Sequence, residues 1–523
     1  MNRTHLIRAA IIAALGGISA SPSYADDAAL QAQVEALRAA ITEQRAQLEA
    51  QAKLLEAQQA QLEALTRQLT QPKAPAQDAP KVTINNNRPT ITSGDGRSSI
   101  AFRANVQIDG ASYGESPAGP LGTDFRRGSV GGLPNRENTA ARDMSNDLFV
   151  RRARIGIEGA IAKDWSYKFL AELGGSGTEG PARINDTWVA YSGFAPFTIQ
   201  LGAFAPLANM DDSTSAEDIP FLERASASEI ARSLAGADGR LGVAVKANGN
   251  RWMSSLALTT RTVGDAEVFD SQSAALGRVG FLVATGSDYN VHLGASGSYV
   301  FALADQGEGT TPRHPVRFRD RPEVRADGVR LIDTGNIDAE HVSVFGAELG
   351  ANWKNLYLQG EHFWYDVTRP ASGNLNDPSF TGYYLQGSWI LTGENRRYNP
   401  VTGSFQAPRA KTPFSSTGGF GALEIAARFS RMDLNFEEGL DGTAAIPGSV
   451  RGGDQQIWTF GVNWYPNPNI KVMLDYLLID VNRLNPAGPG NTQPFGPTPN
   501  TPPDGAQIGQ ALDVIALRTQ FSF

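Results

Sequence analysis

The stretch Leu517-Arg-Thr-Gln-Phe-Ser-Phe523 decides the fold. Apolar and polar side chains alternate along it, the apolar set being Ile515, Leu517, Phe521 and Phe523 and the polar set Arg518, Gln520 and Ser522. Because successive side chains of a strand point to opposite faces, one face of this strand is apolar and the other is wet. Such a strand, ending on an aromatic residue, is typical of a transmembrane β-barrel with an aromatic girdle.

The same alternation recurs along the chain and is clear near 98–109, where Phe102 and Val106 alternate with Arg103 and Gln107. We expect an all-β transmembrane barrel over 98–523. Strand lengths near ten residues suit tilted strands that cross a bilayer. The pattern predicts sixteen antiparallel strands, near 98–109, 147–160, 164–174, 183–193, 197–204, 239–248, 251–261, 275–284, 290–301, 341–353, 355–367, 381–393, 417–431, 455–465, 468–482 and 508–522.

The connections between these segments are alternately long and short, as expected for outer loops and periplasmic turns. One connection on the side of the short turns, Gly393–Ser416, is long. Either this segment folds into the lumen or it hides a further pair of strands.

The N-terminal part has a different organisation. Residues 1–25 carry Arg3 and Arg8, an apolar run and a small-residue cleavage site at Ser23–Ala25, which predicts a secretory signal peptide. Residues 26–70 follow a seven-residue apolar repeat that predicts a periplasmic coiled coil between chains, with its oligomeric state undecided. The alternative is a single helix that folds onto its own barrel. A polar, proline-rich stretch, 71–97, is expected to be a linker.

Composition narrows the function. The chain has 523 residues, no cysteine, 46 basic and 54 acidic side chains, so an acidic balance speaks against a nucleic-acid partner. None of its five histidines lies in a Gly-x-Ser-x-Gly or His-Glu-x-x-His context. We therefore expect no enzyme, and no catalytic residue, metal or cofactor.

Two arginine clusters are candidate binding residues on the wet side of the barrel: Arg151, Arg152 and Arg154, and Arg317, Arg319, Arg321 and Arg325. In an extended chain, alternate residues lie on one side about 7 Å apart. A row of guanidinium groups would attract anions and pass them from one weak site to the next. The alternative is that these side chains pair with nearby acids and only stabilise the wall.

The residues from about Ser98 to Phe523 resemble the phosphate-selective porin O and P family. The resemblance rests on Leu148-Phe-Val-Arg-Arg-Ala-Arg-Ile-Gly-Ile-Glu-Gly, Asp164-Trp-Ser-Tyr-Lys-Phe, Phe221-Leu-Glu-Arg, Arg317-x-Arg-x-Arg-Pro-Glu, Leu391-Thr-Gly-Glu-Asn-Arg, Glu424–Arg428 and Gly461-Val-Asn-Trp-Tyr. It implies a sixteen-stranded, homotrimeric channel of the Gram-negative outer membrane, surrounded by outer-membrane lipid.

The resemblance also implies roles for particular residues. Arg317, Arg319, Arg321 and Arg325 match an arginine ladder, and Arg151 and Arg152 match its lower rung. The third loop would fold inward as a constriction containing Ser213, Ser215 and Arg224, and a periplasmic turn would also fold inward. The family often has lysine where this chain has Ala205, and 205–238 contains seven acids against only two arginines.

We therefore expect a passive diffusion porin for small anions such as phosphate, guided by lumen arginines. The acidic third loop leaves the permeant solute and its phosphate specificity open. The alternative is an envelope tether, in which the coiled coil contacts periplasmic partners or peptidoglycan and the barrel is the anchor.

Overall fold

The computed structural model describes residues 27–70, 79–85, 88–115, 144–175, 182–486 and 504–523. The chain divides into two units, Met1–Gln77 and Asp78–Phe523. The predicted signal peptide, 1–25, lies outside the described residues. The first unit contains helix α2, Asp27–Thr70, of 44 residues. Its heptad leucines, among them Leu37, Leu48 and Leu62, are exposed within the single chain, and association between helices stays a prediction.

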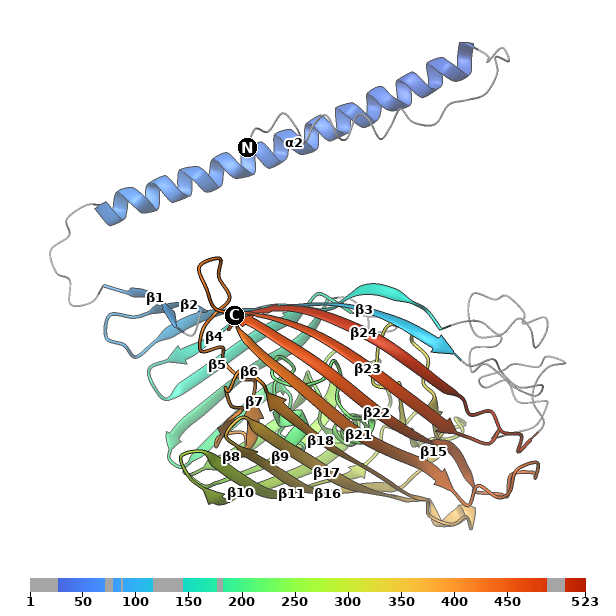
Figure 1. The fold of residues 1–523 in the computed structure, drawn as a ribbon. Helices are drawn as coiled ribbons and strands as arrows, with labels where there is room; N and C mark the ends of the chain where they lie inside the picture. Colours follow the sequence, from blue (N-terminus) through green and yellow to red (C-terminus); the bar gives the residue numbers. More distant parts are fainter. Residues whose placement is uncertain (1–26, 71–78, 86–87, 116–143, 176–181, 487–503) are drawn as a thin grey trace. The chain divides into compact units, whose positions relative to one another are not determined.

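The second unit is an antiparallel barrel of sixteen strands, as predicted (Figure 1). Each strand pairs with its neighbours in sequence, and each overlaps one of the predicted segments. The strands are β3 Ser99–Glu115, β4 Asp147–Ile161, β5 Trp165–Glu172, β6 Arg183–Phe194, β7 Phe197–Phe204, β8 Arg240–Asn248, β9 Trp252–Thr262, β10 Ser273–Thr285, β11 Tyr289–Ala302, β16 His341–Trp353, β17 Leu356–Thr368, β18 Ser379–Ile390, β21 Ala422–Phe436, β22 Val450–Asn467, β23 Ile470–Asn482 and β24 Ala511–Ser522.

The last strand closes the barrel against the first. β24 pairs antiparallel with β3 from Leu512↔Glu115 to Ser522↔Asn105, and the two strands lie side by side in Figure 1. Phe523 and Ala104 extend this ladder by exchanging backbone hydrogen bonds of 3.0 and 3.2 Å. A closed ladder leaves no free edge on either strand, which is what a barrel in lipid requires.

The predicted division into two faces is confirmed. On β24, Ile515 and Leu517 are exposed on the outer surface, whereas Arg518 is fully buried inside. Trp458 and Phe460 on β22 also point outward. Among the described residues, no helix is long and apolar enough to cross a membrane.

Part of the predicted linker forms β-strands. β1, Lys81–Asn85, and β2, Arg88–Thr92, form an antiparallel hairpin, and β2 pairs with β3 at 99–101. The polar composition of this stretch concealed the short alternation of Val82, Ile84 and Ile91 with polar residues. The sheet therefore begins at Lys81, before the predicted barrel start at 98.

Three connections fold into the barrel. The third loop, residues 205–239, contains the helices α3, Met210–Ser213, and α4, Ser226–Ala235. The loop 303–340 contains the short strands β12 Pro315–Val316, β13 Arg319–Asp320, β14 Ile332–Asp333 and β15 Ile337–Asp338, and the segment 393–416 contains β19 Arg397–Asn399 and β20 Ser404–Gln406. The short loop between β17 and β18 carries the helical turn η2, Ala371–Gly373.

These inward segments give the barrel an apolar interior that the alternation does not reveal. Ile230 of α4 and Phe318 of the loop 303–340 belong to the same buried cluster as Tyr365 and Phe380 of the wall. Phe318 makes edge-on ring contacts with Tyr365 and Phe380, with centroids 5.8 and 5.6 Å apart. These contacts fill the interior of the barrel beside β17 and β18.

Candidate functional site

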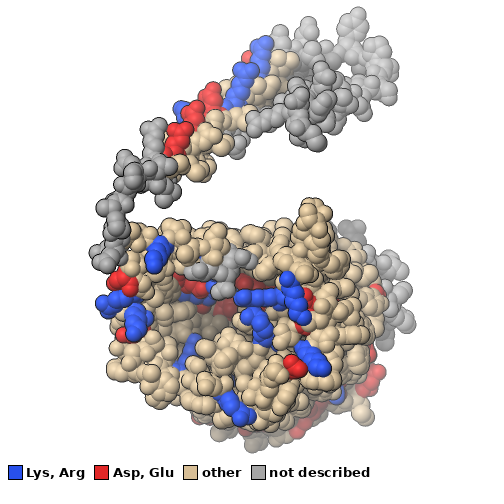
Figure 2. Space-filling view, turned by 60° about the vertical axis from the view of Figure 1, so that its left-hand side comes forward, with Lys and Arg blue, Asp and Glu red and all other residues tan. Residues whose placement is uncertain are grey.

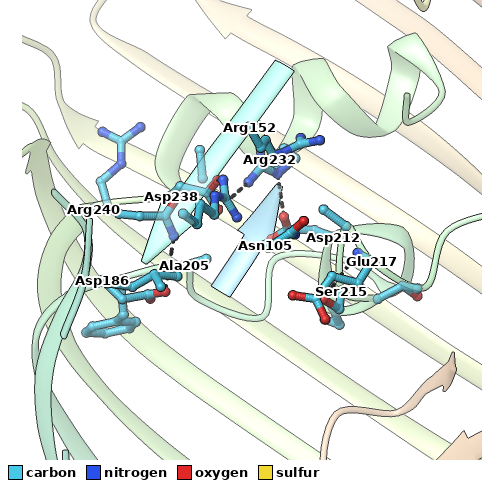
Figure 3. A pocket seen from close by; sticks show the side chains of 18 of the residues that line it. Asn105, Arg152, Asp186, Ala205, Asp212, Ser215, Glu217, Arg232, Asp238 and Arg240 are labelled. Atoms are coloured by element: carbon cyan, nitrogen blue, oxygen red, sulfur yellow. Dashed lines mark hydrogen bonds and ion pairs between the residues drawn. The ribbon is translucent and has the colours of Figure 1, made fainter. Parts of the chain in front are cut away.

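A charged cavity of about 660 Å³ lies between the inner face of β3–β8 and the third loop. Figure 3 shows Asn105 and Arg152 from the wall beside Asp212, Ser215 and Glu217 from the loop. The end of the barrel that carries the short turns is hollowed, with basic side chains around the opening (Figure 2).

Basic side chains outnumber acidic ones in this cavity. Twelve Lys and Arg residues line it against seven Asp and Glu, an excess of five positive charges among the described residues. The basic set is Arg88, Arg103, Arg151, Arg152, Arg154, Lys168, Arg183, Arg224, Arg232, Arg240, Lys246 and Arg325. The acidic set is Asp186, Asp212, Glu217, Asp218, Glu223, Glu229 and Asp238, so six of the seven acids come from the third loop.

The loop carboxylates dock the loop onto the arginines of the wall. Glu223 accepts from Arg151 at 2.6 and 3.1 Å, from Arg325 at 3.2 Å and from Arg518 at 3.0 Å. Burial alone would raise the pKa of Glu223, but Arg151 and Arg325 outweigh burial and hold the pKa of this carboxyl well below its usual range. Glu223 is therefore an ionised anchor between the loop, the wall and the loop 303–340.

A second anchor lies at the end of α4. Asp238 bonds Arg154 at 2.7 Å and Arg232 at 3.2 Å, and Arg154 also holds Glu172 at 2.7 Å. Burial opposes ionisation here too, yet Arg154 and Arg232 lower the pKa of Asp238. Glu229, beside Arg232 and Arg325, has its pKa lowered to about 2 against the effect of burial.

Glu217 behaves differently because its partner is farther away. Burial raises the pKa of Glu217, and this outweighs Arg103, whose guanidinium lies 3.5 Å from the carboxylate. Arg103 is shared with Glu158 at 3.0 Å, so it compensates Glu217 only in part. Burial therefore favours the protonated form of Glu217, in contrast to Glu223, Glu229 and Asp238.

Within the part of the chain that the structure describes, four cavity cations donate to groups other than carboxylates: Arg152, Arg224, Arg240 and Lys246. Arg224 and Arg240 are held by backbone carbonyls, Arg224 within the third loop at 2.6–3.4 Å and Arg240 at 2.8–3.0 Å. Lys246 donates to the amide oxygen of Gln200 at 2.5 Å. Arg152 donates to Gln107 at 2.6 Å, and its buried Nε has no partner in the described part of the chain.

The predicted site residues separate into two groups. Arg151, Arg152, Arg154 and Arg325 line the cavity, as do Ser213, Ser215 and Arg224 of the third loop. Ser213 accepts from Arg278 at 3.0 Å and donates to the Asn209 carbonyl at 2.6 Å, so it fixes the loop to the wall.

The other predicted arginines lie outside the cavity lining. Arg317 is exposed and paired with Asp333, and Arg319 is exposed on the same side of the chain. Arg321 is 2% exposed and breaks the expected row. The loop turns sharply after it, with Glu323 at a φ of 59°, so that alternate residues no longer share a face.

The sequence prediction missed Lys168, Arg240 and Lys246 as site residues. Their signal was present in the alternation, which places them on the wet face of β5 and β8. What was missing is the position of the third loop, which selects this wall as the open side of the lumen.

The long segment 393–416 folds into the lumen. Arg396 bonds Glu424 at 2.7 and 2.8 Å, and Arg278 of β10 donates to the carbonyls of Thr402 and Gly403 at 2.6 and 2.8 Å. Gln406 reaches the cavity lining. Among the described residues, no group of three or more acidic or histidine side chains could hold a metal ion.

The chain is similar in sequence to two curated proteins. Over 433 residues the chain is 25% identical to an uncharacterized protein of Caulobacter vibrioides, covering 81% of this chain and 77% of that one. It is 22% identical over 362 residues to Porin O of Pseudomonas aeruginosa, covering 65% and 78%.

Among solved structures, OmpT of Vibrio cholerae matches with a TM-score of 0.45 at 10% identity, covering 82% of this chain and 98% of that one. An anion-selective porin from Comamonas acidovorans matches with a TM-score of 0.43 at 11% identity, covering 82% and 100%. The family model described as phosphate-selective porin O and P matches residues 127–492. The chain therefore belongs to the phosphate-selective porin O and P family and is an outer-membrane β-barrel porin, a channel without enzymatic activity.

Proposed function

We propose that this porin is a passive diffusion channel for small anions such as phosphate, guided by cations on the β3–β8 wall. The observation that carries the proposal is the excess of five positive charges in the cavity, with Arg152 buried and donating to Gln107 rather than to a carboxylate. Five of the six third-loop acids that line the cavity pair with arginines, and Asp218 accepts from the Ala407 backbone N–H, so the acidity of that loop serves mainly to hold the loop in place.

The mechanism follows from weak, successive interactions. A cavity lined by one sign of charge raises the local concentration of the opposite ion. Conduction also requires that each site release the ion easily. Arg152, Arg224 and Lys246 are spread over β4, the third loop and β8, so they offer separate contacts along the cavity rather than one tight site.

We further propose that the protein forms a homotrimer whose N-terminal helices associate as a periplasmic coiled coil. The heptad leucines of α2 are exposed in the single chain, which supports a partner for that helix. The barrel sheet begins with β1 and β2 at the end of the short turns, which supports a periplasmic origin for the helix.

Single-channel recording in planar bilayers tests the channel proposal. The purified protein should open reproducibly in chloride, and added phosphate should be conducted with only shallow block. A barrel that inserts but shows no reproducible opening would support the tether alternative instead, in which the helix contacts peptidoglycan or other periplasmic partners.

A further inference from the structure

One corner of the cavity is apolar rather than charged. It lies where the third loop leaves β7, at Phe204-Ala-Pro-Leu207, and it continues onto Leu170 of β5 and Trp188 of β6. Figure 3 shows Ala205 in this corner, near Asp186 and Arg240. An apolar surface in an ion path offers nothing to a fully hydrated inorganic anion, so its presence bears on which solutes the channel favours.

Trp188 is the main element of this corner. It is half-buried, and it pairs with Lys168 on β5 and with Gly202 on β7. Gly202 has a φ of 137°, and a Cβ there would lie 2.3 Å from the Thr187 carbonyl oxygen and 2.8 Å from the Trp188 Cα. The backbone thus leaves no room for a side chain at Gly202. Its strand partner on β8 is also a glycine, Gly242. The indole therefore has no side chain directly opposite it on the inner face of β7, where Gln200 and Phe204 flank Gly202.

Lys246 lies within reach of the same corner. Gln200, which holds the Lys246 ammonium, is two residues from Gly202 on the same face of β7, about 7 Å along the strand. The ammonium also lies 5.8 Å from the centroid of the Phe204 ring. Lys168, by contrast, forms an ion pair with Asp186 at 2.7 Å. One ammonium group that donates to an amide oxygen rather than to a carboxylate thus borders an apolar surface.

We infer that this corner, formed by Leu170, Trp188, Phe204, Ala205 and Lys246, makes the channel prefer small carboxylates with an aromatic or compact hydrocarbon body. The carboxylate binds the Lys246 ammonium, and the apolar body lies against Trp188 and Ala205. The inference rests on the proposed anion channel and names the substrate class that its lining favours. Phosphate would pass, but it would gain nothing from the apolar surface.

A comparison of how strongly benzoate and acetate block the chloride current tests this inference. Each is added to the purified protein in a planar bilayer while the chloride current is recorded. Removing roughly 55 Å² of ring surface from water predicts half-block by benzoate at about tenfold lower concentration than by acetate. Both anions carry one carboxylate, so their ratio isolates the contribution of the apolar body.

Three variants locate the effect. Trp188→Ala should bring the benzoate-to-acetate ratio close to one and leave the chloride-to-potassium ratio unchanged. Lys246→Gln should weaken block by both carboxylates, and Ala205→Lys should reduce the preference for benzoate by placing an ammonium in the apolar corner. Trp458→Ala, on the outer surface, is the matched control and should change neither ratio.

The outcomes separate this inference from the function on which it rests. Equal block by benzoate and acetate in a channel that prefers chloride over potassium would overturn the inference and leave the anion channel standing. A benzoate preference that persists in Trp188→Ala would also overturn it. Preference for potassium over chloride would reject the proposed function itself.

Discussion

Replacing Arg152 by glutamine removes a buried cation that lines the cavity and donates to Gln107 rather than to a carboxylate. The glutamine retains a hydrogen-bonding group for Gln107, and Gln107 keeps its bond of 2.7 Å to Gln520. The wall should therefore remain intact while the cavity loses one positive charge. Barrel integrity is checked by far-ultraviolet circular dichroism and by heat-modifiable electrophoretic mobility.

The size of the effect follows from Coulomb's law. A unit charge about 5 Å from a passing ion contributes about 0.8 kcal/mol in water, reduced to about 0.5 kcal/mol at 0.1 M salt. Loss of this energy lowers the permeability of chloride about twofold and raises that of potassium by the same factor. The chloride-to-potassium permeability ratio should fall about fivefold in 0.1 M KCl and less than twofold in 1 M KCl.

Reversal potentials under a KCl gradient measure this ratio directly. The matched control is Arg317→Gln, because Arg317 is bound to Asp333 and does not line the cavity. The control should change the ratio by less than about 1.5-fold in 0.1 M KCl, since its charge is farther from the path. A fall in the ratio for Arg317→Gln with no change for Arg152→Gln would refute the assignment of the ion path to the β3–β8 wall.

Three further changes have defined outcomes. Glu223→Gln leaves buried guanidinium groups without their shared carboxylate, so docking of the third loop should weaken by roughly 3–5 kcal/mol. The thermal unfolding temperature should fall and the single-channel current should become noisier. An unchanged unfolding temperature and unchanged current noise would contradict the anchoring role of Glu223. Because burial raises the pKa of Glu217, acidification should protonate it at a higher pH than an ordinary glutamate, which removes negative charge from the cavity and increases chloride preference. Glu217→Gln should flatten that response. Deleting residues 27–70 should preserve single-channel conductance but reduce the survival of the oligomer in detergent; loss of conductance would show that the helix is part of the channel.

The barrel itself was predictable because lipid and water act on alternate residues. Phe102 and Leu517 face outward and Arg518 faces inward as the alternation requires, and the closing strand was evident from its terminal aromatic residue. The hairpin β1–β2 was missed because its two strands are five residues each, too short for the alternation to stand out in a proline-containing stretch.

The site was predictable only in part, because loop folding depends on contacts between residues distant in sequence. Arg152 belongs to a strand, so its inward direction follows from the alternation. Its neighbour Arg151 is also buried because an irregularity in the β3–β4 register falls between Val150 and Arg152, and no alternation predicts this. The positions of the Arg317 and Arg321 side chains depend on a loop that turns at Glu323 and packs Phe318 against the wall. No local pattern records that Glu223 meets Arg518 across 295 residues.

The reversal potential of the unmodified protein in a KCl gradient tests the central claim most directly. An excess of fixed positive charge in the cavity predicts that chloride carries most of the current at 0.1 M salt and pH 7. The reversal potential should then have the same sign as the equilibrium potential of chloride. A reversal potential of the opposite sign, set by potassium, would contradict the role given to Arg152, Lys246 and the other cations of the β3–β8 wall.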